Sequence, residues 1–184
     1  MNAVIATHTD WIQTFTGKQF WPLDPHIEDI DIRDIAHALS NLCRYGGHVE
    51  QFYSVAQHSV LVSREVPAEH ALRGLLHDAS EAYLIDIPRP IKHSPGMEVY
   101  RAAENVLQRA IYLRFGLGPE DPDCIKTTDR LLLRTEQRDL MKPAPVAWQD
   151  DRSGALSETI IPWTPLASRI TFLNRFNELT TFTH

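Results

Sequence analysis

Two polar side chains fall where the helical pattern calls for apolar ones, and both are of types that bind metals. His58 shares a predicted helix face with apolar neighbours such as Val62, and Asp129 lies between Ile125 and Leu132 on another. A buried imidazole costs free energy unless both ring nitrogens find partners. An unpaired buried carboxylate costs more still. The pattern therefore predicts that each of these side chains meets a compensating group.

The segment 75–81 (LLHDASE) adds a second pair of such residues. His77 and Asp78 follow two leucines, and Glu81 comes four residues after His77, which predicts that the two share one helix face. A single divalent cation would offset both carboxylates and use both imidazoles as neutral ligands. The predicted ligands are His58, His77, Asp78 and Asp129. Two nitrogen and two oxygen donors suit Mn²⁺, Co²⁺, Fe²⁺, Zn²⁺ or Ni²⁺.

Each of these residues also has a structural interpretation. A histidine on an apolar helix face is more often a hydrogen-bonded core residue than a ligand. Asp129 could pair with Arg130 or Arg134, and a His-Asp dipeptide arises by chance. Taken singly, each residue is better explained structurally. The joint pattern favours a metal site.

The elements that must bring these residues together are helices. Apolar spacing and the positions of proline and glycine predict helices from about residue 31 to the glycines at 46–47, and over about 55–65, 68–83, 95–115, 122–141 and 165–180. Asp31 or Asp34 is expected to cap the first helix and Ser54 the second. Before them, a turn at 16–18 predicts a small hairpin. The fold class expected is all-α, a bundle of five to six main helices with a small extended or hairpin N-terminal region.

Composition limits the class of protein. The chain has 184 residues, a net charge of -6, 43% hydrophobic residues and two cysteines. One domain over 1–184 is expected, with 1–30 and the helix at 165–180 packed on a core that spans 31–141. The acidic balance disfavours a groove for a nucleic-acid polymer. With no long apolar run and no basic, apolar leader, we expect no membrane partner and a cytoplasmic location.

The motif residues, with their spacing, resemble a known family. A His, a His-Asp pair and an Asp some fifty residues later, here His58, His77-Asp78 and Asp129, are the motif of the HD-domain metal-dependent phosphohydrolases. The surrounding blocks are similar too: VAQHSVLVSR, GLLHDASEAYLIDIPRPIK and TTDRLLLRTE. The second block resembles the small deoxynucleotidase-like branch, which includes bacterial 5′-deoxynucleotidases and phage dATP triphosphohydrolases.

The resemblance implies a helical core, one bound divalent metal and hydrolysis of a (deoxy)nucleotide phosphate ester. In it Glu81 corresponds to a general acid or base, and Asp86 to the residue that orients the water. Apart from the motif, Glu81 would be a charge on a helix surface and Asp86 a turn residue.

The same resemblance also implies which cationic side chains bind the substrate phosphate. Lys92, Arg89 and Arg44 are the candidates, and Tyr45 stands where the relatives have Trp. His37 shares a polar helix face with Arg44 and is either a pocket wall or a solvated residue.

The partner expected is a small nucleotide. The reaction is either release of phosphate from a deoxynucleoside 5′-monophosphate or release of triphosphate from a dNTP, with Mg²⁺ an additional cofactor for a triphosphate. Relatives are often dimers, so a homo-oligomer is also compatible with the resemblance. Two rival classes are a catalytically weak nucleotide sensor that binds metal and a helical interaction protein that binds none.

Overall fold

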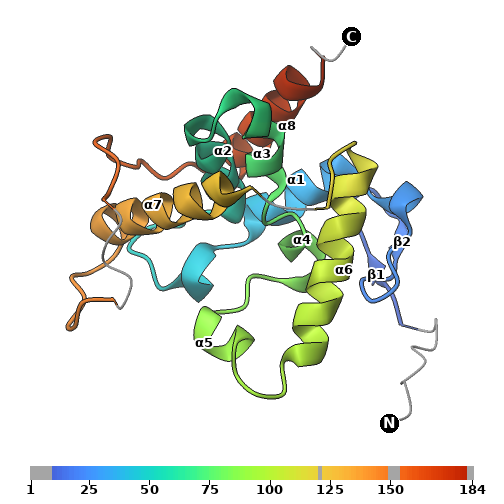
Figure 1. Cartoon of the computed structure of the whole chain (residues 1–184), viewed down its shortest axis with the longest axis horizontal. Coiled ribbons are helices and arrows are strands. Elements are labelled where there is room, and N and C mark those ends of the chain that lie inside the picture. Colours follow the sequence, from blue (N-terminus) through green and yellow to red (C-terminus); the bar gives the residue numbers. More distant parts are fainter. Residues whose placement is uncertain (1–9, 120–121, 149–153, 182–184) are drawn as a thin grey trace.

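The computed structural model describes residues 10–119, 122–148 and 154–181, and the remainder of the expected N-terminal region, 1–9, lies outside the described part. The chain is mostly helical with one small hairpin, as expected (Figure 1). The hairpin is β1 (Ile12–Gln13) and β2 (Gln19–Phe20). The main helices are α1 (Ile32–Asn41), α2 (Val55–Glu65), α3 (Ala71–Leu76), α6 (Glu98–Arg114), α7 (Asp123–Leu140) and α8 (Pro165–Thr181). Single helical turns form α4 (Glu81–Leu84), α5 (Arg89–Lys92) and the 3-10 segments Ile27–Asp29, Arg44–Gly47 and Ala68–His70.

Helix α2 is the central element. It packs against α1, α3, α7 and α8 (Figure 1). Ser54 caps it as predicted, because its hydroxyl accepts a bond from the Gln57 amide at 3.1 Å. The predicted range of 55–65 is confirmed to the residue. A helix with neighbours on every side buries its polar residues as well as its apolar ones, and His58 is one of these.

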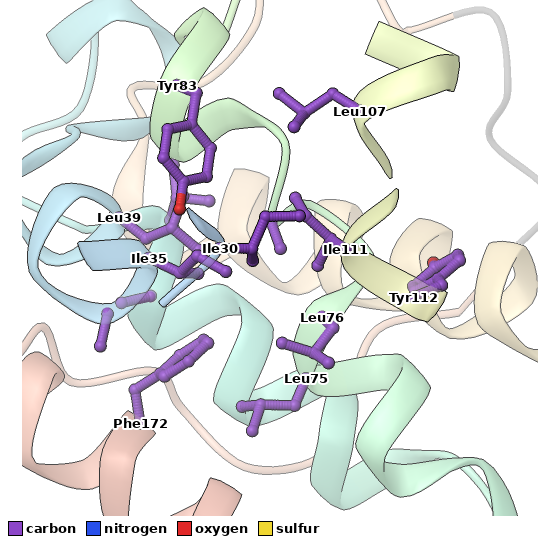
Figure 2. Close-up of a cluster of buried hydrophobic side chains, with 14 of the residues drawn as sticks. Ile30, Ile35, Leu39, Leu75, Leu76, Tyr83, Leu107, Ile111, Tyr112 and Phe172 are labelled. Carbon is purple, nitrogen blue, oxygen red and sulfur yellow. The ribbon is translucent and has the colours of Figure 1, made fainter. Parts of the chain in front are cut away.

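The main apolar cluster fixes the helices around α2 relative to one another. Figure 2 shows Leu39 of α1, Leu76 of α3, Ile111 of α6 and Phe172 of α8 pointing into one cluster. All four side chains are fully buried, and each contributes about 1.5–3 kcal/mol relative to an exposed position. This packing holds the end of α3, and so His77, at a fixed distance from α2.

The hairpin is tied to α1 by a buried carboxylate. Ile12 pairs with Phe20 in antiparallel register, and Gly17 takes a φ of 84°, which few other residues adopt. The Thr16 amide and hydroxyl donate to Asp34 at 2.7 and 2.9 Å. Asp34 is therefore used as a hairpin anchor, while Asp31 caps α1 through the Arg33 amide.

The continuous helix predicted over 68–83 is wrong. The chain forms a 3-10 turn, then α3, a turn at 77–80 and the single turn α4. Here the Gln108 side chain of α6 binds backbone groups of the turn. Its amide nitrogen donates to the Leu76 carbonyl at 2.7 Å, and its oxygen accepts from the Ser80 amide at 3.0 Å. These are the two groups that an α-helix would join to each other. The face shared by His77 and Glu81 therefore does not exist as expected.

The helices expected over 95–115, 122–141 and 165–180 begin and end within a few residues of those positions. The first predicted helix is shorter than expected: α1 ends at Asn41 instead of at the glycines at 46–47, because Leu42 and Cys43 are extended and Cys43 bridges to Ser54. Arg44 therefore lies in the 3-10 segment and does not share a helix face with His37. Within the described ranges, no helix combines the length and the apolar character that crossing a bilayer requires.

Candidate metal centre

Side chains from three elements converge beside α2. His58 comes from α2, His77 from the turn after α3, and Asp129 from α7, and one ligand atom of each lies within 4.8 Å of the others. The two Nε2 atoms of the histidines are 3.3 Å apart. The Asp129 Oδ1 lies 3.2 Å from the His58 Nε2. This cluster could hold a metal ion.

The far nitrogen of each imidazole is already engaged. The His77 Nδ1 lies 2.8 Å from the Gly74 carbonyl oxygen, and the His58 Nδ1 lies 2.6 Å from the Glu136 Oε1. A carbonyl and an ionised carboxylate only accept, so both Nδ1 atoms must donate. In the neutral rings, both Nε2 lone pairs then point into one space and repel each other unless a cation lies between them. The donor set thus fits a metal bound by neutral imidazoles.

Asp78 lies at the edge of this cluster. Its Oδ2 is 3.2 Å from the His77 Nε2 and 3.7 Å from the His58 Nε2. The Arg44 guanidinium reaches the same oxygen at 3.4 Å. Asp129 differs from its expected environment, because its side chain is 44% exposed and not buried in an apolar face. It is the most exposed of the four candidate ligands.

The electrostatics of the cluster favour added positive charge. Burial and the Arg44 charge oppose protonation of His58, but Glu136 and Asp129 outweigh them and raise its pKa to about 9. His77 is also buried, and Asp78 beside it raises its pKa. Burial disfavours the charged form of Asp78, yet His77 and His58 hold the pKa of that carboxyl far below its ordinary range. Without a metal, protons take the place that a cation would fill.

Arg44 and Tyr45 are brought to the cluster by a loop that returns to its own start. The Arg44 amide donates to the Tyr53 carbonyl at 2.9 Å, and the Val55 amide donates to the Leu42 carbonyl at 3.1 Å. Tyr45 has a φ of 58°, a left-handed conformation that costs a non-glycine residue about 1–2 kcal/mol. Its hydroxyl donates to Glu136, and this bond holds the ring near the Arg44 guanidinium, which lies 5.2 Å from the ring centroid.

A second carboxylate pair follows the turn. Glu81 is only 7% exposed, and its Oε2 has no hydrogen-bond partner among the residues that the structure describes. Burial, and then the charges of Asp78 and Asp86, raise the pKa of Glu81 well above its ordinary value. Burial likewise raises the pKa of Asp86. Between them Ile85 has a φ of 71° and a ψ of 149°, a strained conformation for a β-branched residue.

The chain is similar in sequence to two known bacterial proteins. No family model matches it. The chain is 40% identical over 171 residues to the uncharacterized protein YfdR of Escherichia coli (strain K12), an alignment that covers 92% of this chain and 95% of YfdR. The chain belongs to the YfdR family. It is also 38% identical over 125 residues to an uncharacterized protein of Rhodobacter capsulatus, an alignment that covers 63% of each chain. Neither relative's name states an activity, so the function of this YfdR-family protein must be argued from its site.

Of the remaining candidates in this YfdR-family chain, Lys92 lies near the site, whereas Arg89 and His37 do not contact the cluster in the part of the chain that the structure describes. Burial opposes the charge of Lys92, but Glu104, which pairs with it at 2.5 Å, raises its pKa, and the charges of Glu81 and Asp78 add to this. Arg89 is exposed on α5. His37 stacks on Phe15 at 3.8 Å, and its Nδ1 lies 3.4 Å from an Arg169 nitrogen. Its described contacts are therefore with the hairpin and α8, and it is not part of the cluster.

Sequence reasoning missed one residue of this YfdR-family site. Glu136 of α7 is fully buried and accepts from His58, Arg44, Tyr45 and Tyr53. Burial opposes its charge, but the Arg44 guanidinium and the His58 ring hold its pKa at about 2. The signal was its spacing: Glu136 follows Asp129 by seven residues, two turns of one helix face.

Proposed function

We propose that this protein is a metal-dependent phosphohydrolase of the HD-domain type that removes phosphate from a deoxynucleoside 5′-monophosphate. The observation that carries the proposal is the pairing of the His58, His77 and Asp129 cluster with the buried, unpartnered carboxyl of Glu81. Asp78 is the proposed fourth ligand, because its Oδ2 lies 3.2 Å from the His77 Nε2. Mn²⁺, Co²⁺, Fe²⁺, Zn²⁺ and Ni²⁺ are the candidate ions.

The cation, when bound, would neutralise charge on the phosphate oxygens and lower the pKa of a bound water. The protein's own cations complete the phosphate site. Arg44 already contacts Asp78 at 3.4 Å, so its guanidinium lies at the edge of the cluster. Lys92 lies near enough to Glu81 for its charge to act on that carboxyl. We assign both to the phosphate oxygens, and Arg89, which is exposed, to a weaker role.

The two raised carboxyl pKa values suit proton transfer. Water attacks phosphorus, the bond from phosphorus to the 5′-oxygen breaks, and its electron pair leaves on that oxygen. Glu81 is protonated before the reaction, so it gives its proton to the leaving oxygen. Asp86 accepts a hydrogen bond from the attacking water and orients it. The proton that the water loses passes through Asp86 to solvent, and Glu81 takes a proton back from solvent as the products leave. A proton-donating carboxyl must be shielded from solvent and lie near other negative charges, and Glu81 meets both conditions.

The charge around the site favours a monophosphate over a triphosphate. Two cations, Arg44 and Lys92, act on Glu81, and both already face carboxylates. A dNTP brings several more negative charges and would require further cations or Mg²⁺. We therefore rank phosphate release above triphosphate release.

A metal-by-nucleotide panel tests the proposal. Protein stripped by chelator is loaded with each ion in turn and incubated with deoxynucleoside monophosphates and with dNTPs, and the products are resolved by ion-exchange chromatography. We expect phosphate and a deoxynucleoside from the monophosphates. Triphosphate as the product would reassign the substrate. No release from any nucleotide by fully loaded protein would favour the sensor over the enzyme.

One matched pair of variants tests the metal site itself. Asp129→Ala should lose bound metal, measured by mass spectrometry of the desalted protein, and activity with it. Asp123→Ala, an exposed residue at the start of the same helix, should change neither. Unchanged metal content in Asp129→Ala would support a helical interaction protein instead.

A further inference from the structure

Glu136 divides its two oxygens between two parts of the site. Oε1 faces the His58 Nδ1 at 2.6 Å and accepts from the Tyr53 hydroxyl at 2.9 Å. Oε2 accepts from the Arg44 Nε at 3.2 Å and from the Tyr45 hydroxyl. One oxygen serves the metal ligand, and the other serves the residues proposed to read the phosphate.

This carboxylate does not touch the space between the candidate ligands. Its side chain is completely buried behind His58, and all of its described partners are donors. It therefore acts through other residues and not on a substrate. A buried group that receives four donors has one orientation that satisfies them all. Such a group is well suited to fix its partners.

Its effect on His58 is set by hydrogen-bond chemistry. An ionised carboxylate cannot donate, so the His58 Nδ1 must carry the proton and its Nε2 must present the lone pair to the cluster. A carboxylate behind a metal-bound imidazole also makes that imidazole a better ligand. The other oxygen of Glu136 fixes the orientation of the Arg44 guanidinium. Its Nε donates to Glu136, and its Nη1 then points toward Asp78, which it reaches at 3.4 Å.

We propose that Glu136 is a positioning residue that couples the metal ligand His58 to the phosphate-binding Arg44, so that one carboxylate sets both the metal affinity and the phosphate affinity of the site. This inference rests on the proposed metal-dependent function.

Glu136→Gln is the sharpest variant. A carboxamide has almost the same shape but one acceptor oxygen and one donor nitrogen, so it cannot accept on both sides. Whichever way it turns, its nitrogen faces either His58 or Arg44, and its charge is gone from both. Asp34→Asn is the matched control, because Asp34 is 3% exposed, accepts two bonds from Thr16 and anchors the hairpin away from the cluster.

Two binding measurements make the test. The Mn²⁺ affinity of the metal-free protein is measured by competition with a chromophoric chelator. Inorganic phosphate binding is then measured by calorimetry at saturating Mn²⁺, so that loss of metal does not mimic loss of phosphate. In Glu136→Gln we expect Mn²⁺ affinity to fall about 10–100-fold, the usual range for removing the partner of a metal-bound histidine. Phosphate affinity should fall as well, while Asp34→Asn keeps both.

The outcomes separate this proposal from the proposed function. Wild-type protein that binds no Mn²⁺ would refute the metal site. Wild-type protein that binds Mn²⁺, with Glu136→Gln equal to it in both affinities, would refute only the role of Glu136. A loss of one affinity alone would refute the coupling.

A measurement on the wild type covers the case in which Glu136→Gln does not fold. In Zn²⁺-loaded protein with ¹⁵N-labelled histidine, the His58 ring should show a proton on Nδ1 and metal on Nε2. Metal on Nδ1, or an Nδ1 without its proton, would overturn the proposal.

Discussion

Two buried glutamates about the same cluster have opposite acidities. Both are buried: the Glu136 side chain is 0% exposed, and Glu81 as a whole residue is 7% exposed. Burial alone would raise the pKa of both. Instead the Arg44 guanidinium and the His58 ring hold the pKa of Glu136 at about 2, while burial and the charges of Asp78 and Asp86 raise that of Glu81 well above its ordinary value.

The difference teaches that partners, and not depth, decide what a buried carboxyl does here. Glu136 receives four donors and is a permanent anion that orients its neighbours. Glu81 has an oxygen with no described partner and two anions nearby, so it keeps a proton. The first arrangement is suited to positioning and the second to proton transfer.

The largest effect should come from removing the proton of Glu81. Glu81→Gln keeps the shape but cannot protonate a leaving oxygen, so we expect turnover to fall about 10²–10⁴-fold, the usual contribution of a general acid. Bound metal should be unchanged, because Glu81 is not among the ligands. Single-turnover phosphate release at saturating substrate measures the fall. An active Glu81→Gln would show that Glu81 is not the proton donor.

Removing the Glu136 side chain should lower the unfolding free energy more than removing that of Glu81. Glu136→Ala leaves Arg44 with a buried charge that has lost its main partner, which costs about 3–5 kcal/mol of unfolding free energy. Glu81→Ala removes a carboxyl that has no described partner for one oxygen, and should cost much less. Urea unfolding of both variants in the presence of chelator compares them without a contribution from metal. Equal losses would mean that the two carboxyls are held alike.

The two glutamates should also give stability opposite dependences on pH. Glu136 has a pKa of about 2 in the folded chain against an ordinary value of 4.5. Its contribution, about 3 kcal/mol, is present above pH 4.5 and is lost as the pH falls toward 2. Glu81 keeps its proton when folded and releases it when unfolded, so its contribution is unfavourable and grows as the pH rises above 4.5.

Urea unfolding at a series of pH values, in the presence of chelator, measures the unfolding free energy on both the acid and the alkaline side of pH 4.5. Glu136→Gln should flatten the acid limb below pH 4.5. Glu81→Gln should flatten the limb above it and gain on the wild type as the pH rises. Curves that stay parallel to the wild type in both variants would contradict the difference in acidity.

Much of this could be predicted from sequence, because the controlling patterns are local. The range of α2 and its cap at Ser54 follow from apolar spacing and one hydroxyl. The grouping of His58, His77 and Asp129 was predicted from polar residues among apolar ones, although only His58 lies on a buried helix face. The break after α3 could not be predicted, because the side chain that causes it, Gln108, comes 28 residues after Ser80.

Glu136 was missed for a related reason. A glutamate two turns after Asp129 has the spacing of a surface charge as well as of a buried partner. Only the loop that returns Arg44 and Tyr45 to α7 makes it a four-donor acceptor. The exposure of Asp129 was missed because apolar neighbours along one helix do not say whether another element covers it.

The smallest expected effect concerns the backbone next to Glu81. Ile85 has a φ of 71° and is 61% exposed, so its side chain contributes little packing to offset the strain. Glycine takes this conformation freely, and Ile85→Gly should raise the unfolding free energy by about 1 kcal/mol after its entropic cost. Ile91→Gly, also exposed but without a positive φ, should lower it by about 0.5–1 kcal/mol. Thermal unfolding in chelator measures both. If Ile85→Gly also loses turnover at unchanged metal content, the strain serves to aim Asp86. If it loses stability as Ile91→Gly does, the backbone at residue 85 is not strained.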